Sequence, residues 1–376
     1  MSFGNNDYVP VSLSVLKSGM NIDYSVFREN NREFLLLCKD VVLNDELLER
    51  FKRLTYPSYI VYMPRSRYQS IQSEKRKQQR KAKKVAFQKN YEIAKDVTSK
   101  MLDRIAADDN VPVAVADELA QAVHNQVELM EITYIIESIN SMRKVDQYLH
   151  THSVNVALLN GIIGKWLKLD TESLAALVKV GLLHDIGKLK IPQGILDKPT
   201  RLTEEEFDLI IHHPIYSLEL LERSGFTDER ILQGVAQHHE RVNGMGYPQG
   251  LNANSMCEFA RITSISDVYD AMVAKRAYKE AHSPFEILSW FAEGCYSELD
   301  FRFVTVFIDS MTEEFKGKRV LLSDGNIGTV MFFNRQNIAF PIVQMIHDGS
   351  TVSTSEELRC VRIIDDFDDE FSHLIQ

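Results

Sequence analysis

The chain has 376 residues, which at about 150 residues per domain indicates two or three folded units. Its 44% hydrophobic and 26% charged residues, with only 17 Gly and 10 Pro, are typical of a soluble globular protein and exclude collagen-like, mucin-like and wholly disordered classes. The formal charge of −10 argues against a nucleic-acid-binding protein, because such proteins usually carry a basic surplus.

The cysteines and the hydropathy pattern favour a cytoplasmic protein. The four cysteines are far apart and show no CxxC spacing, so neither a zinc knuckle nor a disulfide framework is indicated. The first ten residues lack a charged start followed by an apolar stretch, and no run approaches about 18 consecutive apolar residues. We therefore expect no signal peptide and no membrane span.

The first 143 residues are expected to form a small α+β domain over 1–72, followed by a connector and linking helices over 73–143. Short apolar runs predict strands at 33–39 and 59–63, with a helix near 44–54 between them. Residues 74–84 hold seven basic residues against one Glu, which predicts a solvated, mobile connector; a patch for nucleic acid or an anionic membrane is the alternative. Helical periodicity follows over 85–142, interrupted near Asn110 and Pro112.

The remaining residues predict a helical domain over 144–316 and a β-rich appendage with an acidic tail over 317–376. The helical domain has expected loops at 189–202 and 241–256, and Thr203 with Glu206 predicts a capping box. Strands are expected at 319–322, 327–333 and 341–346, separated by Asp-Gly turns. The predicted fold class is mainly α, with small β-containing parts at both ends.

Histidines are concentrated in the helical domain. Seven of the 11 lie between positions 150 and 239: His150, His152, His184, His212, His213, His238 and His239. Four expected helical segments offer imidazoles: one ends at His184-Asp185, others are closed by His238-His239 and by His212-His213, and His152 lies early in a fourth. Burying so many polar rings without a metal would leave many atoms needing partners, so the pattern predicts a metal site.

The segment 261–272 offers two candidate carboxylates for this site, and an ordinary helix-capping or salt-bridging acid is the alternative role. Asp267 has mostly apolar or small neighbours, and Asp270, three residues later, would lie on nearly the same face of a helix. Periodicity alone leaves open which of the two is a ligand. Neutral imidazole and carboxylate suit divalent iron, manganese or zinc.

These residues resemble the HD-GYP family of cyclic-dinucleotide phosphodiesterases over about residues 144–315. The resemblance rests on a series of short motifs in matching order: His152-Ser153, His184-Asp185-Ile-Gly187-Lys188, Ile191-Pro192, Lys198-Pro199, His213-Pro214, His238-His239-Glu240-Arg241, Gly244-Met-Gly246-Tyr247-Pro248, Asp267 and Arg276-Ala-Tyr278. Residues 8 to about 130 resemble, less specifically, an N-terminal domain of unknown function that often precedes HD-GYP domains.

The resemblance implies a centre of two divalent ions, iron or manganese. One ion would be held by His152, His184, Asp185 and Asp267, and the other by His213, His238 and His239, with Asp185 bridging the two. His150, His212 and Asp270 are left out of this set. Some relatives bind a third ion with a Glu four residues before the first His, and Tyr148 stands there in this chain.

The resemblance also implies substrate contacts and a reaction. Lys188 would neutralise the phosphate or assist the leaving oxygen, Arg276 and Lys279 would hold phosphates, and the loop of Gly246, Tyr247 and Pro248 would border the site. Asn243 stands where the family usually has Asp. The expected reaction is hydrolysis of cyclic di-GMP to pGpG or GMP, with 3',3'-cyclic GMP-AMP as the alternative substrate. Diguanylate cyclase domains or other signalling proteins are expected partners of the Gly-Tyr-Pro loop, and homo-oligomers are left open.

Two other functions compete with this prediction. A different HD-type phosphohydrolase, acting on deoxynucleotides or guanosine tetraphosphate, would use a single metal and lack the His238-His239 pair. A non-catalytic receptor would bind the dinucleotide and pass the signal to a partner, but the full ligand set argues against it.

Overall fold

The computed structural model describes residues 8–11, 17–22, 25–28, 31–35, 41–53, 59–141, 148–273, 283–294 and 297–364. The chain divides into two compact units, Met1–Lys83 and Lys84–Gln376. Helices dominate the described residues, which confirms the mainly α fold class. Within these residues no helix has an apolar stretch of the length that a bilayer crossing needs.

The first unit has the expected small α+β composition. Its main sheet is antiparallel in the order β1-β6-β3-β4, and β2 pairs with β5. The elements are β1 (Tyr8–Val11), β2 (Asn21–Ile22), β3 (Ser25–Arg28), β4 (Asn31–Leu35), β5 (Val41–Val42), α1 (Asp45–Arg53) and β6 (Tyr59–Pro64). The strand predicted at 33–39 corresponds to the end of β4, and its last residues lie outside the described part of the chain.

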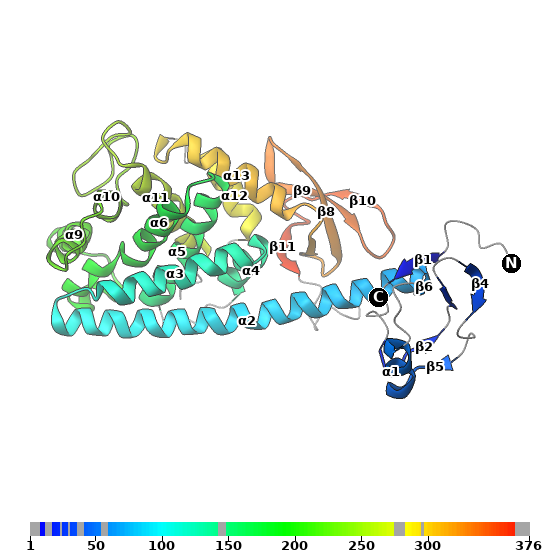
Figure 1. The fold of residues 1–376 in the computed structure, drawn as a ribbon. Helices are drawn as coiled ribbons and strands as arrows, with labels where there is room; N and C mark the ends of the chain where they lie inside the picture. Colours follow the sequence, from blue (N-terminus) through cyan, green and yellow to red (C-terminus); the bar gives the residue numbers. More distant parts are fainter. Residues whose placement is uncertain are drawn as a thin grey trace. The chain divides into compact units, whose positions relative to one another are not determined.

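The basic run lies inside a single long helix, α2 (Arg65–Asp108), which Figure 1 draws in light blue. The run that was expected to form a solvated, mobile connector is therefore continuous helix, and most of its residues are exposed. The run consists mostly of Lys, Arg and Gln, which are good helix formers, and α2 contains neither Gly nor Pro to stop it. The predicted interruption is present at residues 109–112, before the next helix.

The second unit is built around a helical bundle (Figure 1). Its helices are α3 (Val113–Leu129), α4 (Ile132–Ser141), α5 (Tyr148–Trp166), α6 (Thr171–Leu183), the 3₁₀ helix η2 (Ile186–Lys190), α7 (Gln193–Leu196), α8 (Glu204–Ile211), α9 (His213–Arg223), α10 (Glu229–Ala236), α11 (Glu258–Val273), α12 (Pro284–Glu293) and α13 (Phe301–Phe315). The predicted capping box of Thr203 and Glu206 begins α8. The loop expected at 189–202 also contains the short α7.

Helices α5 and α6 form the centre of this bundle. Residues 151–164 of α5 are all buried, and α6 packs against α5, α3 and α10. Gly181 permits the close approach of α6 to α5, because a Cβ there would lie 2.5 Å from the Cα of Ala157. This packing brings the start of α5 and the end of α6, which carry His152 and His184, next to each other.

The C-terminal strands form one antiparallel sheet that packs on α12 through β9 (Figure 1). The strands are β7 (Arg319–Leu322), β8 (Ile327–Asn334), β9 (Asn337–Met345), β10 (Thr351–Ser353) and β11 (Cys360–Ile364), in the order β10-β9-β8-β7-β11. The Asp-Gly turns are present, with Gly325 and Gly349 at φ +85° and +71°. The short strands β10 and β11 were not predicted, and the acidic tail lies outside the described residues.

Candidate metal centre

The end of α6 is fixed against the start of α9. The Ser217 hydroxyl donates to the carbonyl oxygen of His184 at 2.9 Å and accepts from the Gly187 N–H at 2.8 Å. A Cβ at Gly187 would lie 2.1 Å from the carbonyl oxygen of His213, so only Gly fits there. The prediction that His213 closes a helix is wrong: it is the first residue of α9, because Pro214 suits the first turn of a helix.

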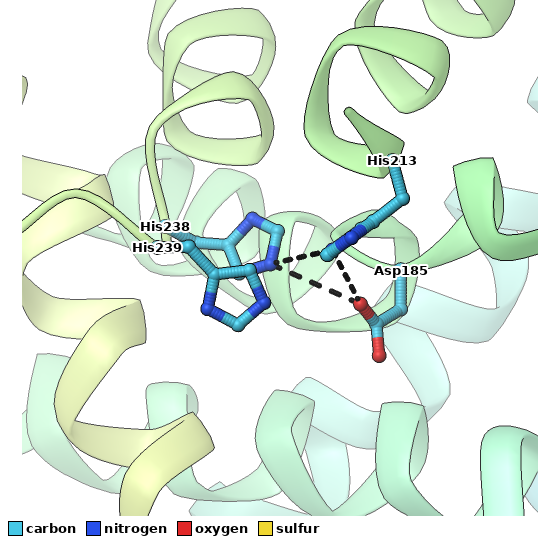
Figure 2. A group of neighbouring side chains, drawn as sticks. All are labelled: Asp185, His213, His238 and His239. Carbon is cyan, nitrogen blue, oxygen red and sulfur yellow. Dashed lines mark hydrogen bonds and ion pairs between the residues drawn. The ribbon is translucent and has the colours of Figure 1, made fainter. Parts of the chain in front are cut away.

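The buried carboxylate of Asp185 lies between two pairs of imidazoles. Its Oδ2 is 3.5 Å from Nε2 of His152 and 3.4 Å from Nε2 of His184. Its Oδ1 is 3.1 Å from Nε2 of His213 and 3.8 Å from Nε2 of His238, and Figure 2 shows these two rings pointing toward it. Each carboxylate oxygen of Asp185 therefore faces a different pair of imidazoles, as a carboxylate that bridges two metal ions requires.

A second carboxylate, Asp267 of α11, spans the same two groups of histidines. Its Oδ1 is 3.2 Å from Nε2 of His152, and its Oδ2 is 3.6 Å from Nδ1 of His239. The rings of His238 and His239 are adjacent, with centroids 4.1 Å apart. All seven ligands predicted from the sequence thus lie in one cluster.

Backbone carbonyls fix the tautomers of three of these histidines. Nδ1 of His184, His213 and His238 lies 2.8, 2.7 and 2.7 Å from a carbonyl oxygen, those of Gly181, Ile210 and Val235 respectively. A carbonyl oxygen only accepts, so the ring proton sits on Nδ1 and Nε2 presents its lone pair to the cluster.

The lone pairs converge in a way that suits a cation. Nε2 of His152 lies 3.1 Å from Nε2 of His184, and Nε2 of His213 lies 3.4 Å from Nε2 of His238. Asp185 Oδ1 is buried and accepts no hydrogen bond from the residues that the structure describes. Acceptors that face each other in a buried site need a positive charge between them, and this nitrogen and oxygen donor set fits a divalent transition metal.

The electrostatics of the cluster favour neutral rings at His238 and His239 and ionised carboxylates at Asp185 and Asp267. Burial and the neighbouring imidazoles hold the pKa of His238 well below its usual range, and burial does the same for His239. Burial opposes ionisation of Asp185, but Lys188 and the histidines outweigh it and lower its pKa well below the usual value. Burial likewise lowers the pKa of His184, but Asp185 and Asp267 outweigh it, and the net shift is upward.

The Gly-Tyr-Pro loop lies against this cluster. The buried Glu240 carboxylate accepts from the backbone N–H groups of Gln249 at 2.7 Å and Leu251 at 2.8 Å, which holds the loop beside His239. The ring of Tyr247 lies over His239, with centroids 4.6 Å apart. Gly246 is required by close packing, since a Cβ there would lie 2.5 Å from the His239 carbonyl oxygen. Pro248 follows in the same loop.

Three basic residues were predicted to contact substrate. Lys188 Nζ lies 2.6 Å from Asp185 Oδ2, and its side chain is 22% exposed, so the ammonium group stands at the border between the cluster and solvent. Arg276 and Lys279 lie outside the described residues. Asn243 accepts a hydrogen bond from the Met245 N–H at 2.9 Å, so the amide supports the turn that an Asp would support.

His150, His212 and Asp270 were left out of the predicted ligand set, and of these only Asp270 contacts the cluster among the described residues. Burial and the charge of Lys95 of α2 lower the pKa of His150, which makes no hydrogen bond, ion pair or ring contact with the cluster among the described residues. His212 is half-exposed, and its Nδ1 lies 2.6 Å from the carbonyl oxygen of Asp208. Asp270 contacts His152, and its spacing from Asp267 is the signal in the sequence that could have indicated this.

Known proteins that are similar to this chain include an HD-domain family and phosphodiesterases of cyclic dinucleotides. Residues 136–293 match the family model described as an HD domain. The cyclic di-GMP phosphodiesterase PA4108 of Pseudomonas aeruginosa is 31% identical over 210 residues, 55% of this chain and 50% of the relative. The 3'3'-cGAMP-specific phosphodiesterase 1 of Vibrio cholerae is 34% identical over 165 residues, 43% of this chain and 37% of the relative.

One solved structure, the HDG"Y"P protein Bd1817 of Bdellovibrio bacteriovorus, aligns with a TM-score of 0.48 and 17% identity over 81% of this chain and 99% of that one. The chain spans half or less of the length of the two curated relatives above. The helical bundle with its His-Asp cluster is an HD domain, a metal-dependent fold family. More narrowly, the chain resembles the HD-GYP family, and the names of these curated relatives are consistent with that resemblance.

Proposed function

We propose that this protein is a metal-dependent phosphodiesterase that hydrolyses a cyclic dinucleotide. The observation that carries the proposal is the convergence of five imidazoles on the carboxylates of Asp185 and Asp267, with Asp185 facing both groups. A site with one shared carboxylate and donors on both sides suits two cations rather than one.

The proposed centre holds two divalent ions, Fe or Mn. His152, His184, Asp185 and Asp267 would hold one, and His213, His238 and His239 would hold the other, with Asp185 shared between them. When bound, such ions lower the pKa of a water molecule and polarise a phosphoryl oxygen, which prepares a phosphodiester for hydrolysis.

The chain's own residues would bind and orient the substrate. Lys188 would contribute an ammonium group at the border of the cluster, where it can bind a phosphate oxygen and stabilise the charge that develops on it. The half-buried Tyr247 would form a wall of the site beside His239, with Gly246 and Pro248 setting its position. Arg276 and Lys279 are proposed to bind phosphates, since an Arg fork matches phosphate geometry.

Cyclic di-GMP is the proposed substrate, converted to pGpG or GMP, and 3',3'-cyclic GMP-AMP is the second candidate. The names of the relatives support both, because those with cyclic di-GMP in their names and those specific for 3'3'-cGAMP reach similar identities, 31% and 34%. We also propose the division of the chain at residues 72, 143 and 316, a cytoplasmic location, and a protein-binding role for the Gly-Tyr-Pro loop.

The test is a hydrolysis assay with Fe(II)- or Mn(II)-loaded protein and each cyclic dinucleotide, with products separated by chromatography and metal content measured in parallel. We expect turnover of at least one dinucleotide and close to two ions per chain. Binding of dinucleotide without turnover under both metals would instead indicate a receptor. One ion per chain, with activity on other nucleotides, would indicate a different HD-type hydrolase.

A further inference from the structure

Asp270 lies against the metal cluster without belonging to its expected ligand set. Its side chain is buried, and its Oδ2 is 2.7 Å from Nδ1 of His152. Asp267, one turn earlier on α11, contacts Nε2 of the same ring at 3.2 Å. The two carboxylates of α11 therefore flank one imidazole, one at each nitrogen.

The place of His152 in its helix explains why it needs a side-chain partner. His184, His213 and His238 each follow or lie beside a helix end, where the carbonyl three residues earlier is free to accept from Nδ1. His152 lies inside α5, four residues after its start, where the preceding carbonyls accept from the helix backbone itself. The carboxylate of Asp270 takes the place that a backbone carbonyl takes for the other three.

The contact with Asp270 sets the direction of the His152 lone pair. Both carboxylates only accept, but Asp270 is the closer of the two, at 2.7 Å against 3.2 Å for Asp267. A proton on Nδ1 is therefore favoured, and Nε2 then faces His184 and Asp267 with its lone pair. A carboxylate is a stronger acceptor than a carbonyl, and it makes the opposite nitrogen a better metal ligand. It also adds a negative charge next to the site without using a coordination position.

We propose that Asp270 is a positioning residue for His152, and that it sets the metal affinity of the part of the centre formed by His152, His184 and Asp267. This inference rests on the proposed metal centre of the function above. It assigns to Asp270 an effect on one group of donors and none on the group of His213, His238 and His239, which Asp270 does not contact among the described residues.

The test is titration of the metal-free full-length protein with Mn(II) by isothermal calorimetry, comparing wild type, Asp270→Asn and Asp270→Ala. We expect about 10- to 100-fold weaker binding at one class of site, with the larger loss in the Ala variant, and unchanged binding at the other class. The Asn variant is nearly isosteric and keeps an acceptor for Nδ1–H, so it keeps the experiment decisive if the Ala variant does not fold.

Asp300→Asn is the matched control. Asp300 is also buried, and it binds α11 through Arg261 at 2.9 Å without contact to the cluster among the described residues. The Asp300→Asn variant should bind Mn(II) with the same affinity as the wild type. Equal affinity of Asp270→Asn and wild type, or an equal loss at both classes, would overturn the inference. Because no substrate is present, an inactive wild type with this selective Mn(II) loss would refute the proposed reaction and leave the inference standing.

Discussion

At the scale of single residues, Asp185 has the largest predicted effect on activity. Both of its oxygens face imidazoles, so its loss removes the one group shared by the two halves of the cluster. We expect Asp185→Ala to lower kcat/KM for the cyclic dinucleotide by more than about 100-fold. Loss of a residue that only hydrogen-bonds to a metal ligand costs at most about that much, and Asp185 is proposed to be a ligand itself. Turnover and bound metal, measured on the same sample, check this.

His150→Ala is the control on the neighbouring helix. His150 is two residues from His152 but makes no hydrogen bond, ion pair or ring contact with the cluster among the residues that the structure describes. Its replacement should change activity by no more than about twofold, as for a surface substitution away from special features. A comparable loss in Asp185→Ala and His150→Ala would show that the ligand assignment on α5 is wrong.

Residue types and spacing indicated a metal site formed by histidines and acids, whereas the set of seven ligands followed only from the family resemblance. Imidazoles and acids at the ends of apolar segments are expected to be buried together, and the structure places all seven predicted ligands in contact. The spacing of Asp267 and Asp270 indicated a shared face of α11 but could not decide which acid meets Nε2 of His152 and which meets Nδ1. That choice depends on the packing of α5 against α11, which no local pattern encodes.

At the scale of elements, the Gly-Tyr-Pro loop depends on close backbone packing at Gly246. A Cβ there would lie 2.4 Å from the Arg241 N and 2.5 Å from the Glu240 Cα, which are backbone atoms that cannot rotate away. We expect Gly246→Ala to destabilise the protein by about 3 kcal/mol, the upper part of the range for overpacking. It should also displace Tyr247 and lower activity.

Urea unfolding of Gly246→Ala beside Gly194→Ala gives the comparison. Gly194 lies in α7, and a Cβ at this position would point into open space, so Ala fits there and should be neutral or slightly stabilising, by about 0.5 kcal/mol. Equal unfolding free energies for the two variants would mean that the loop does not pack as described.

The helix cap at Asp300 predicts a pH-dependent stability. Its carboxylate accepts from the Arg302 N–H at 3.0 Å and pairs with Arg261 of α11, so it joins α13 to the helix that carries Asp267. Burial opposes its ionisation, but Arg302 and Arg261 outweigh this, and its pKa lies below the usual value. Loss of such a cap in Asp300→Ala should cost about 1–2 kcal/mol at pH 7.

The sign of the pH effect follows from the lowered pKa. The contribution of Asp300 is fully present above its unfolded pKa of about 3.9 and is lost as the pH falls through the lower folded value. The difference in unfolding free energy between wild type and Asp300→Ala should therefore stay constant from pH 7 to about 4 and shrink below it. A difference that is unchanged at pH 3 would contradict the assigned pairing.

Helices were easier to predict than strands, for physical reasons. The capping box at Thr203 and the break before α3 follow from local chemistry that sequence records directly. The strands β10 and β11 are short, and β11 is stabilised by pairing with β7, some 40 residues earlier in the chain. The start of α9 at His213 was mistaken for a helix end because both kinds of terminus place histidine beside a loop.

At the scale of the whole molecule, the sequence patterns did not predict the full length of helix α2. A run of like charges suggested a solvated connector, whereas the absence of Gly and Pro allows one helix to continue through it. The boundary between the two compact units, at Lys83 and Lys84, falls inside this helix. The polypeptide therefore enters the second unit as regular structure.

The last prediction concerns how α2 is held to the helix that carries His152. The Tyr91 hydroxyl of α2 donates to Asn155 Oδ1 of α5 at 2.6 Å, and both residues are buried. Tyr91→Phe should leave that amide oxygen without this donor and cost about 1–3 kcal/mol of unfolding free energy. Tyr216→Phe, at a half-buried ring beside His212, should cost less than about 0.5 kcal/mol.

A double-mutant cycle separates this hydrogen bond from general packing. Asn155→Ala should cost less in the Tyr91→Phe background than in the wild type, by about 1 kcal/mol, because the partner is already gone. Urea unfolding of the four proteins measures this coupling. Strictly additive losses would mean that the two side chains stabilise the protein independently, and that this pair does not hold α2 to α5.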